Sequence, residues 1–235
     1  MQERVNQFLG FFDKKCSSVQ SLSVSTDDAV FKKMLYVGIL DTLSKTTAYP
    51  TIGNRERLTS FVKHFCSWKY CEKMSLPHLI RFLEKAPHPD FTNLREFVLP
   101  LFDQWKMSES KFDVEPDFSQ LKHLWPRNIQ KHFADVYLES MQHLNLFYRY
   151  RNSLIHELRE LGYGIESEKD IEPFYQYVEH SSKSKHSWEL VYPLRFYESL
   201  CQTAIKNLAI YYVKNRIDPY SFFQFGSYWI EELNV

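Results

Sequence analysis

Residues 144–161 read LNLFYRYRNSLIHELREL, and this stretch decides the fold that we expect for the chain. At about 100° per residue, its apolar side chains fall on one side of a helix. They are Leu144, Phe147, Leu154, Ile155, Leu158 and Leu161. Arg151 falls near the middle of this apolar face, where a charge is costly unless another group pairs with it. The stretch predicts a long amphipathic helix that also carries chemistry.

A second, polar stripe runs along the flank of the same helix. It consists of Asn145, Arg149, Asn152 and His156. Because Asn152 and His156 are one turn apart, both side chains can reach one point beside Arg151. A histidine can shuttle a proton to or from a ribose hydroxyl, an arginine can hold the charge of a phosphate transition state, and an asparagine can position either. The alternative is a polar helix flank with an arginine whose stem lies along apolar surface.

A carboxylate that could pair with Arg151 lies in an earlier expected helix, residues 29–46. The apolar stripe of that helix contains Val30, Met34, Val37 and Leu40. Asp41 falls on the same side, which is an unusual place for an acid. We expect Asp41 to meet Arg151 and aim it. The alternative is a partly exposed Asp41 that only shares this face.

Helical spacing and cap signals also predict the elements before residue 108. The expected helices cover residues 4–16, 29–46, 55–68, 76–84 and 91–107. Ser75-Leu76-Pro77 is typical of an N-cap with proline just inside a helix. The serine-rich residues 18–25 indicate a connector, and Pro100 indicates a bent or divided helix.

The second half predicts a loop, a long helix, a hairpin and a last helix. Residues 108–124 are polar and irregular, so we expect a linker or long loop there. Trp125-Pro126 opens a helix that runs to Met141 or on to Leu161, where Gly162-Tyr163-Gly164 ends it. Two aromatic and β-branched stretches, Phe174–Val178 and Ser187–Tyr192, predict a β-hairpin at about residues 172–193. A final long helix then begins at Pro193.

These elements predict a mainly α fold, a helical bundle with a small inserted hairpin before the last long helix. We expect residues 1–25 to be an N-terminal helix and connector. Residues 26–217 would form the helical domain, and residues 218–235 an aromatic tail packed on it.

Composition limits the classes of function. The 235 residues carry a formal net charge of +0, which argues against a general nucleic-acid binder, and 6 glycines argue against glycine-rich phosphate loops. Cys66 and Cys71 lack a second pair at metal spacing, so reduced structural thiols are expected, with a metal or disulfide role as the alternative. No signal peptide and no apolar run of about 18 residues is found, so we expect a cytoplasmic protein without a membrane segment.

Residues 148–159, YRYRNSLIHELR, resemble the signature of the HEPN superfamily. Its motif is an arginine, usually followed by a polar residue such as asparagine, with a histidine four to six positions on. The glycine-containing stop at 162–164 and the upstream helix with Asp41 are also similar to bacterial members. The pattern covers about residues 28–215.

The resemblance implies a metal-independent endoribonuclease without a cofactor, in which two protomers pack their motif helices together. It gives Arg151 the stabilisation of the phosphate, His156 general acid–base catalysis, and Asn152 a positioning role. The products would carry a 2′,3′-cyclic phosphate. Family members serve in toxin–antitoxin and antiphage systems, so an RNA substrate, a homodimer and an antitoxin or regulatory partner are implied. Some toxins carry a tyrosine two residues after the histidine, where this chain has Leu158, so regulation through that tyrosine is not expected.

A second match to the motif, Arg127-Asn128-Ile129-Gln130-Lys131-His132, begins in a solvated first turn, and we favour the later copy. Lys183 and Lys185, between the expected strands, could contact an RNA backbone, or they could form a solvated hairpin tip.

Two alternatives to a ribonuclease stay open. One is a non-catalytic HEPN-like module for RNA binding or dimerisation, and the other is a helical interaction protein unrelated to RNA.

Overall fold

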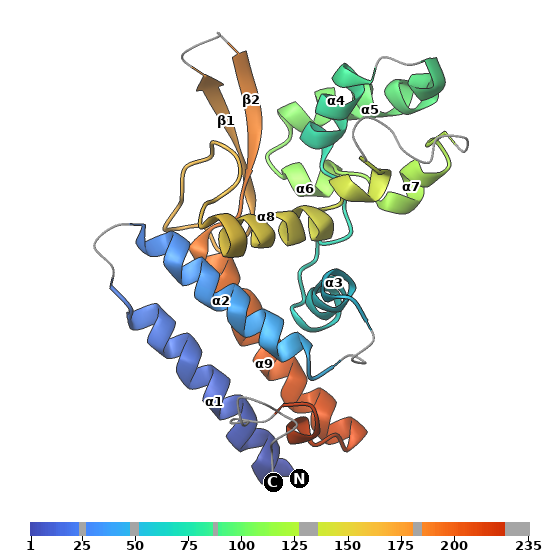
Figure 1. Cartoon of the computed structure of the whole chain (residues 1–235). Helices are drawn as coiled ribbons and strands as arrows, with labels where there is room; N and C mark the ends of the chain where they lie inside the picture. Colours follow the sequence, from blue (N-terminus) through green and yellow to red (C-terminus); the bar gives the residue numbers. More distant parts are fainter. Residues whose placement is uncertain (24–26, 48–51, 87–88, 127–135, 181–184, 224–235) are drawn as a thin grey trace. The chain divides into compact units, whose positions relative to one another are not determined.

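The computed structural model describes the whole chain except residues 24–26, 48–51, 87–88, 127–135, 181–184 and 224–235 (Figure 1). The described part is mainly helical, with one two-stranded antiparallel hairpin before the last long helix, which confirms the predicted fold class at this level. It forms two compact units. One comprises the described residues of Met1–Ser67 and Tyr197–Val235, and the other comprises those of Trp68–Phe196. The domain boundaries expected from the sequence stay a prediction.

In its described residues, the first unit contains helices and no strand. Its elements are α1 (Gln2–Ser21), α2 (Asp28–Ser44), α3 (Asn54–Phe65), most of α9 (Leu194–Asn215) and the short η3 (Pro219–Ser221). α2 packs against both α1 and α3, and η3 packs against α1. Phe8 from α1 meets Tyr212 from α9 edge to face, with ring centroids 6.2 Å apart.

The predicted connector at residues 18–25 begins later than expected, because α1 continues through Ser21. The hydroxyls of Ser17 and Ser18 donate to the carbonyls of Asp13 and Lys14, one turn back in the helix. Val19, within this turn, is buried, so packing stabilises the helix beyond the point where the sequence signal ends.

The second unit combines short helices with the hairpin. Its elements are α4 (Leu76–Lys85), η1 (Pro89–Phe91), α5 (Thr92–Met107), α6 (Lys111–Val114), α7 (Phe118–Lys122), η2 (Leu138–Met141), α8 (His143–Glu157), β1 (Phe174–His180) and β2 (Lys185–Val191). α4 packs on α5, and their apolar faces supply most of one buried cluster. Trp105 of α5 is a fully buried member of this cluster, with its ring 4.9 Å from that of Tyr175 and 5.0 Å from that of Trp188. α5 runs through Pro100 without a division.

The prediction of a linker at residues 108–124 is wrong. The stretch forms α6 and α7, and Phe112, Glu115 and Leu121 are buried. The ammonium group of Lys111 donates to the carbonyls of Trp105 and Ser108 at 3.0 and 2.9 Å. These bonds give partners to carbonyl groups at the C-terminal end of α5, which the helix itself leaves unpaired. From the sequence alone, polar residues that make such internal contacts cannot be distinguished from the polar residues of a loop.

The predicted helix from Trp125 to Met141 or to Leu161 is also wrong in its described part, because the backbone of Tyr137 is extended and only the short η2 follows it up to Met141. The backbone of Gln142 is extended, because the chain there forms a β-bridge with Met74, and this bridge separates η2 from α8. α8 ends at Glu157, since Leu158 adopts a left-handed conformation with φ of 54° and its N–H bonds to the carbonyl of Ser153. Leu158 and Leu161 are consequently exposed outside the helix, and neither belongs to its buried face.

Gly162 and Gly164 therefore have a role other than ending this helix. A side chain at Gly164 would overlap Val191 of β2, and Gly162 has a φ of +83° with Glu189 close by. Glycine is required here because the loop passes close to the hairpin.

The hairpin confirms the predicted strands. β1 pairs with β2 antiparallel, with Tyr175 opposite Leu190 and Tyr177 opposite Trp188. No helix in the described residues is long and apolar enough to cross a membrane.

Candidate functional site

The sequence motif lies in the last two turns of α8. Nη1 of Arg151 donates to Oδ1 of Asn152 over 3.1 Å, and both residues are half-buried. His156 is exposed in the last turn. The buried side of α8 consists of His143, Leu144, Phe147, Tyr150, Ser153 and Leu154. Arg151 and Asn152 thus lie at the edge of the buried side, one turn before an accessible imidazole.

The remaining predicted site residues lie in different places. The amide of Asn145 donates to the carbonyl of Glu139 at 2.8 Å, so it joins α8 to η2. Arg149 lines a pocket on another side of α8. Asp41 belongs to the first unit and Arg151 to the second, and their pairing stays a prediction. Lys183, the earlier motif at 127–132 and the side chain of Lys185 lie outside the described residues.

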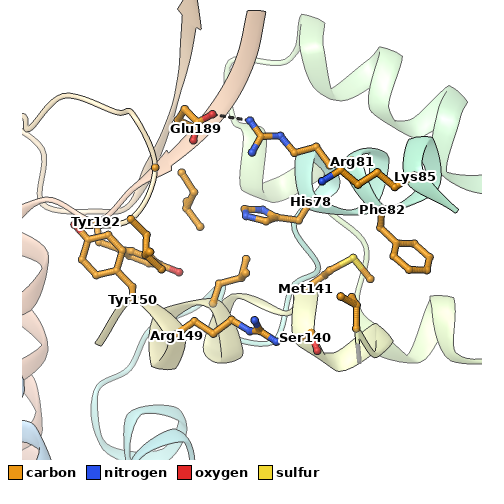
Figure 2. A pocket seen from close by; sticks show the side chains of 15 residues that line it. His78, Arg81, Phe82, Lys85, Ser140, Met141, Arg149, Tyr150, Glu189 and Tyr192 are labelled. Carbon is orange, nitrogen blue, oxygen red and sulfur yellow. Dashed lines mark hydrogen bonds and ion pairs between the residues drawn. The ribbon is translucent and has the colours of Figure 1, made fainter. Parts of the chain in front are cut away.

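The pocket has a volume of about 450 Å³ and is built entirely within the second unit (Figure 2). His78, Arg81, Phe82 and Lys85 come from α4, while Leu146, Arg149 and Tyr150 come from α8; the other lining residues are Val136, Ser140, Met141, Leu161, Gly162, Glu189, Leu190 and Tyr192. Figure 2 shows His78 and Arg81 reaching from α4 toward β2. An apolar pocket of this size with a few converging polar groups is the usual form of a small-molecule site.

One carboxylate faces the cations of the pocket. Nη2 of Arg81 lies 2.6 Å from Oε1 of the buried Glu189 (Figure 2), and the Ser187 hydroxyl donates to the same oxygen at 2.5 Å. Burial alone would raise the pKa of Glu189, but these bonds from Ser187 and Arg81 outweigh it and lower the pKa. Glu189 is therefore ionised, and its ion pair with Arg81 fixes the guanidinium group at the side of the pocket formed by β2.

Lys85 and Arg149 carry the remaining positive charge. Both are exposed, and neither makes a hydrogen bond or ion pair with another residue that the structure describes. Burial lowers the pKa of His78 to about 4, and the charge of Arg81 and, to a smaller extent, that of Arg149 act in the same direction. His78 is therefore neutral near pH 7, and the pocket has an excess of positive charge.

A chain of hydrogen bonds leads from His78 into the core. Nδ1 of His78 lies 2.7 Å from the Ser75 hydroxyl, which lies 2.7 Å from the Tyr175 hydroxyl. Tyr175 in turn lies 2.6 Å from Oε1 of Glu115, whose other oxygen meets Nε2 of the buried His143 at 2.5 Å. The chain thus connects the pocket with a buried carboxylate.

The number of protons available between His78 and Glu115 indicates which group donates and which accepts in each hydrogen bond. Burial and the neighbouring Glu115 raise the pKa of Tyr175 well above its usual value, so the phenol keeps its one proton. The Tyr175 hydroxyl is placed to donate to Glu115 or to Ser75. We assign its one proton to Glu115, the stronger acceptor, so that the Ser75 hydroxyl donates to Tyr175 and accepts from Nδ1–H of His78. Nε2 of the neutral His78 then has no proton and is a hydrogen-bond acceptor.

This pocket was not predicted from the sequence, although part of its signal is present there. His78, Arg81 and Lys85 are spaced by three and four residues, so they share one face of α4. Ser75, Glu115 and Tyr175 gave no local signal, because each meets its partner only through the fold.

No group of three or more histidine, cysteine, aspartate or glutamate side chains suited to a metal occurs within the described ranges. Cys16, Cys66, Cys71 and Cys201 are buried free thiols. Comparisons of the chain with family models, with curated proteins and with solved structures found no significant match.

Proposed function

We propose that this protein is a HEPN-like, metal-independent endoribonuclease that acts as a homodimer through α8. The observation that carries the proposal is the hydrogen bond between Arg151 and Asn152, one turn before the exposed His156. Because Oδ1 of Asn152 accepts from Arg151, the amide group of Asn152 is directed to other acceptors, such as a phosphate oxygen. A role as a toxin or antiphage effector that cuts a structured RNA such as tRNA belongs to this proposal.

In the proposed reaction, His156 of one protomer takes the proton of a ribose 2′-hydroxyl while O2′ attacks the adjacent phosphorus. The bond from phosphorus to O5′ breaks, and the partner's His156 gives a proton to the leaving oxygen. Arg151 stabilises the negative charge on the phosphoryl oxygens. The products are a 2′,3′-cyclic phosphate and a 5′-hydroxyl end.

Exposed apolar residues directly after α8 support the dimer. Leu158, Tyr163 and Ile165 are 63%, 69% and 70% exposed. Large apolar side chains that gather on a surface commonly mark a protein interface. We expect Leu158→Lys with Ile165→Lys to yield monomers in light scattering and to abolish cleavage together with dimerisation.

The test is cleavage of total cellular RNA by the purified full chain in EDTA. The wild type is compared with His156→Ala and with His123→Ala, a matched change at another exposed histidine. We expect fragments with 2′,3′-cyclic phosphate ends from the wild type and from His123→Ala, and none from His156→Ala. Equal fragments from all three proteins would refute the role of His156.

A second candidate is a non-catalytic HEPN-like module for RNA binding or dimerisation. It is favoured by the engagement of Arg151 with Asn152 inside one protomer, which a purely structural arginine would also show. This candidate predicts RNA binding that weakens in Arg151→Ala, without fragments from any variant. Electrophoretic mobility shifts measured beside the cleavage assay separate the two candidates.

A further inference from the structure

The pocket between α4, α8 and β2 is separate in position and chemistry from the motif of α8. Arg149 and Tyr150 line it, whereas Arg151, Asn152 and His156 are not among its lining residues. Its volume of about 450 Å³ is within the range of about 300–1,000 Å³ that small-molecule sites occupy. It can therefore be judged independently of the proposed ribonuclease.

The walls indicate the body of the ligand. Apolar side chains converge from every element of the pocket, including aromatic rings on two sides. They are Phe82, Val136, Met141, Leu146, Leu161, Leu190 and Tyr192. The Tyr150 hydroxyl is directed to Oε1 of Glu160 at 2.8 Å, so this residue offers mainly its ring. Such walls favour an aryl or alkyl group over a sugar, whose hydroxyls would lose their hydrogen bonds there.

The cations indicate the charge of the ligand. The lining contains three cations, Arg81, Lys85 and Arg149, and one carboxylate, Glu189, which binds Arg81. The charges of Lys85 and Arg149 have no counter-charge within the described residues. An anionic group of the ligand would pair with Lys85 and Arg149, while the apolar part of the ligand enters the pocket.

His78 distinguishes between anions. Its Nε2 is an acceptor, because Nδ1–H is used by Ser75 in the chain that ends at Glu115. A carboxylate or a sulfate ester has no proton near pH 7 and would turn a lone pair toward this nitrogen. A phosphate monoester has a second pKa near 6, so below about pH 6 it keeps one proton, which it can donate to Nε2.

We propose that this pocket binds a small organic phosphate, with the aryl or alkyl body among Phe82, Leu146 and Tyr192 and the phosphate at Arg149, Lys85 and His78. The phosphate oxygens accept from the two cations, and below about pH 6 the P–OH of the phosphate monoanion donates to Nε2 of His78. No bond of the ligand is broken. The site is one for binding, and it is independent of RNA cleavage.

The test is isothermal titration of the full chain with 1-naphthyl phosphate as the probe, in a phosphate-free buffer at about pH 5.5, where the probe is mainly a monoanion and His78 is neutral. We expect one site per chain, and about tenfold or weaker binding of 1-naphthyl sulfate, which has the same body but no proton to donate. Inorganic phosphate alone should bind more weakly still, because it lacks the apolar body. Equal affinity for the phosphate and the sulfate would overturn the assignment of His78 as the acceptor.

Variants test the place of binding. Arg149→Met and Lys85→Met change exposed side chains, so both proteins should fold, and near-ultraviolet circular dichroism checks this. We expect each to bind 1-naphthyl phosphate about tenfold more weakly, while Lys122→Met, at an exposed position of α7, leaves the affinity unchanged. Full affinity in both pocket variants, or no binding by the folded wild type, would refute the proposal.

One further pair of variants separates this site from the ribonuclease. Arg151→Ala and His156→Ala should bind the probe as the wild type does, because neither residue lines the pocket. If Arg151→Ala abolished binding of the probe, the phosphate would belong to the motif of α8 and the pocket proposal would fail. Loss of RNA cleavage in His156→Ala with normal probe binding would support both proposals separately.

Discussion

Glu115 and His143 form a hydrogen bond of 2.5 Å between Oε2 and Nε2, and both side chains are fully inaccessible to solvent. Glu115 also accepts from the backbone N–H of Leu76 at 3.2 Å and from the Tyr175 hydroxyl at 2.6 Å. A carboxylate that is buried with several donors is stabilised only as long as all of them remain. This group of contacts joins α6, α4, α8 and β1 at one point of the second unit.

Glu115→Ala should therefore destabilise the protein strongly. It leaves the N–H of Leu76, the Tyr175 hydroxyl and a ring nitrogen of His143 buried without their acceptor. We expect a loss of about 3–5 kcal/mol in the free energy of unfolding, measured by urea denaturation. Glu84→Ala, at an exposed position of α4, is the control and should change it by less than about 0.5 kcal/mol. A loss from Glu115→Ala no larger than that of the control would contradict this account.

Ser75→Ala should release the tautomer of His78. In the wild type, Nδ1 of His78 carries the proton because the Ser75 hydroxyl accepts it, so ¹⁵N NMR should find Nε2 without a proton. In the variant we expect a mixture of the two neutral tautomers. The free energy of unfolding should fall by about 1–2 kcal/mol. Ser119→Ala, which changes an exposed serine of α7, should leave the spectrum of His78 as in the wild type. An Nε2–H tautomer in the wild type would reverse the direction assigned to the whole chain.

The pKa of His78 predicts how stability changes with pH. In the unfolded chain this histidine takes up a proton near its ordinary pKa of 6.5, whereas in the folded protein burial lowers the pKa to about 4. The unfolded state therefore binds more protons between these two values, so the stability conferred by neutral His78 is complete above about pH 6.5 and is lost as the pH falls toward 4. We expect this loss to be on the order of 1–3 kcal/mol by pH 4.

The matching measurement compares wild type and His78→Gln by urea denaturation at several pH values. Other groups titrate in both proteins, so the difference between their unfolding free energies isolates His78. That difference should change between pH 6.5 and 4 and stay constant between pH 7 and 8. A constant difference over the whole range would show that His78 titrates alike in the folded and unfolded chain.

Gly164→Ala should destabilise the second unit, because the new methyl group would overlap Val191 of β2. We expect a loss of about 1–3 kcal/mol in the free energy of unfolding. Gly10→Ala is a control of opposite sign, since nothing lies within 4 Å of a methyl group at that position of α1. Alanine favours a helix more than glycine, so this variant should gain up to about 1 kcal/mol. Thermal unfolding of both variants beside the wild type checks the two signs, and an unchanged melting temperature in Gly164→Ala would contradict the close approach.

Much of the secondary structure could be predicted from local sequence. The hairpin follows from its aromatic and β-branched strands, and α4 begins where Ser75-Leu76-Pro77 indicates. The errors arose where a distant segment decided the conformation. Gln142 is extended because it pairs with Met74, and no local rule contains this partner. Residues 108–124 fold because Phe112, Glu115 and Leu121 enter a core that the sequence does not display.

The sequence by itself determined that the chain is mainly helical and that Arg151, Asn152 and His156 lie within two turns of one helix. Helical periodicity is local, so side chains a few residues apart can be placed without the rest of the fold. Only the tertiary structure decided that Arg149, on the same helix, lines a pocket with His78 and Arg81. It also decided the chain of hydrogen bonds that starts at His78, because that chain depends on Tyr175 and Glu115, which are far apart in sequence and meet only when the hairpin packs on the short helices.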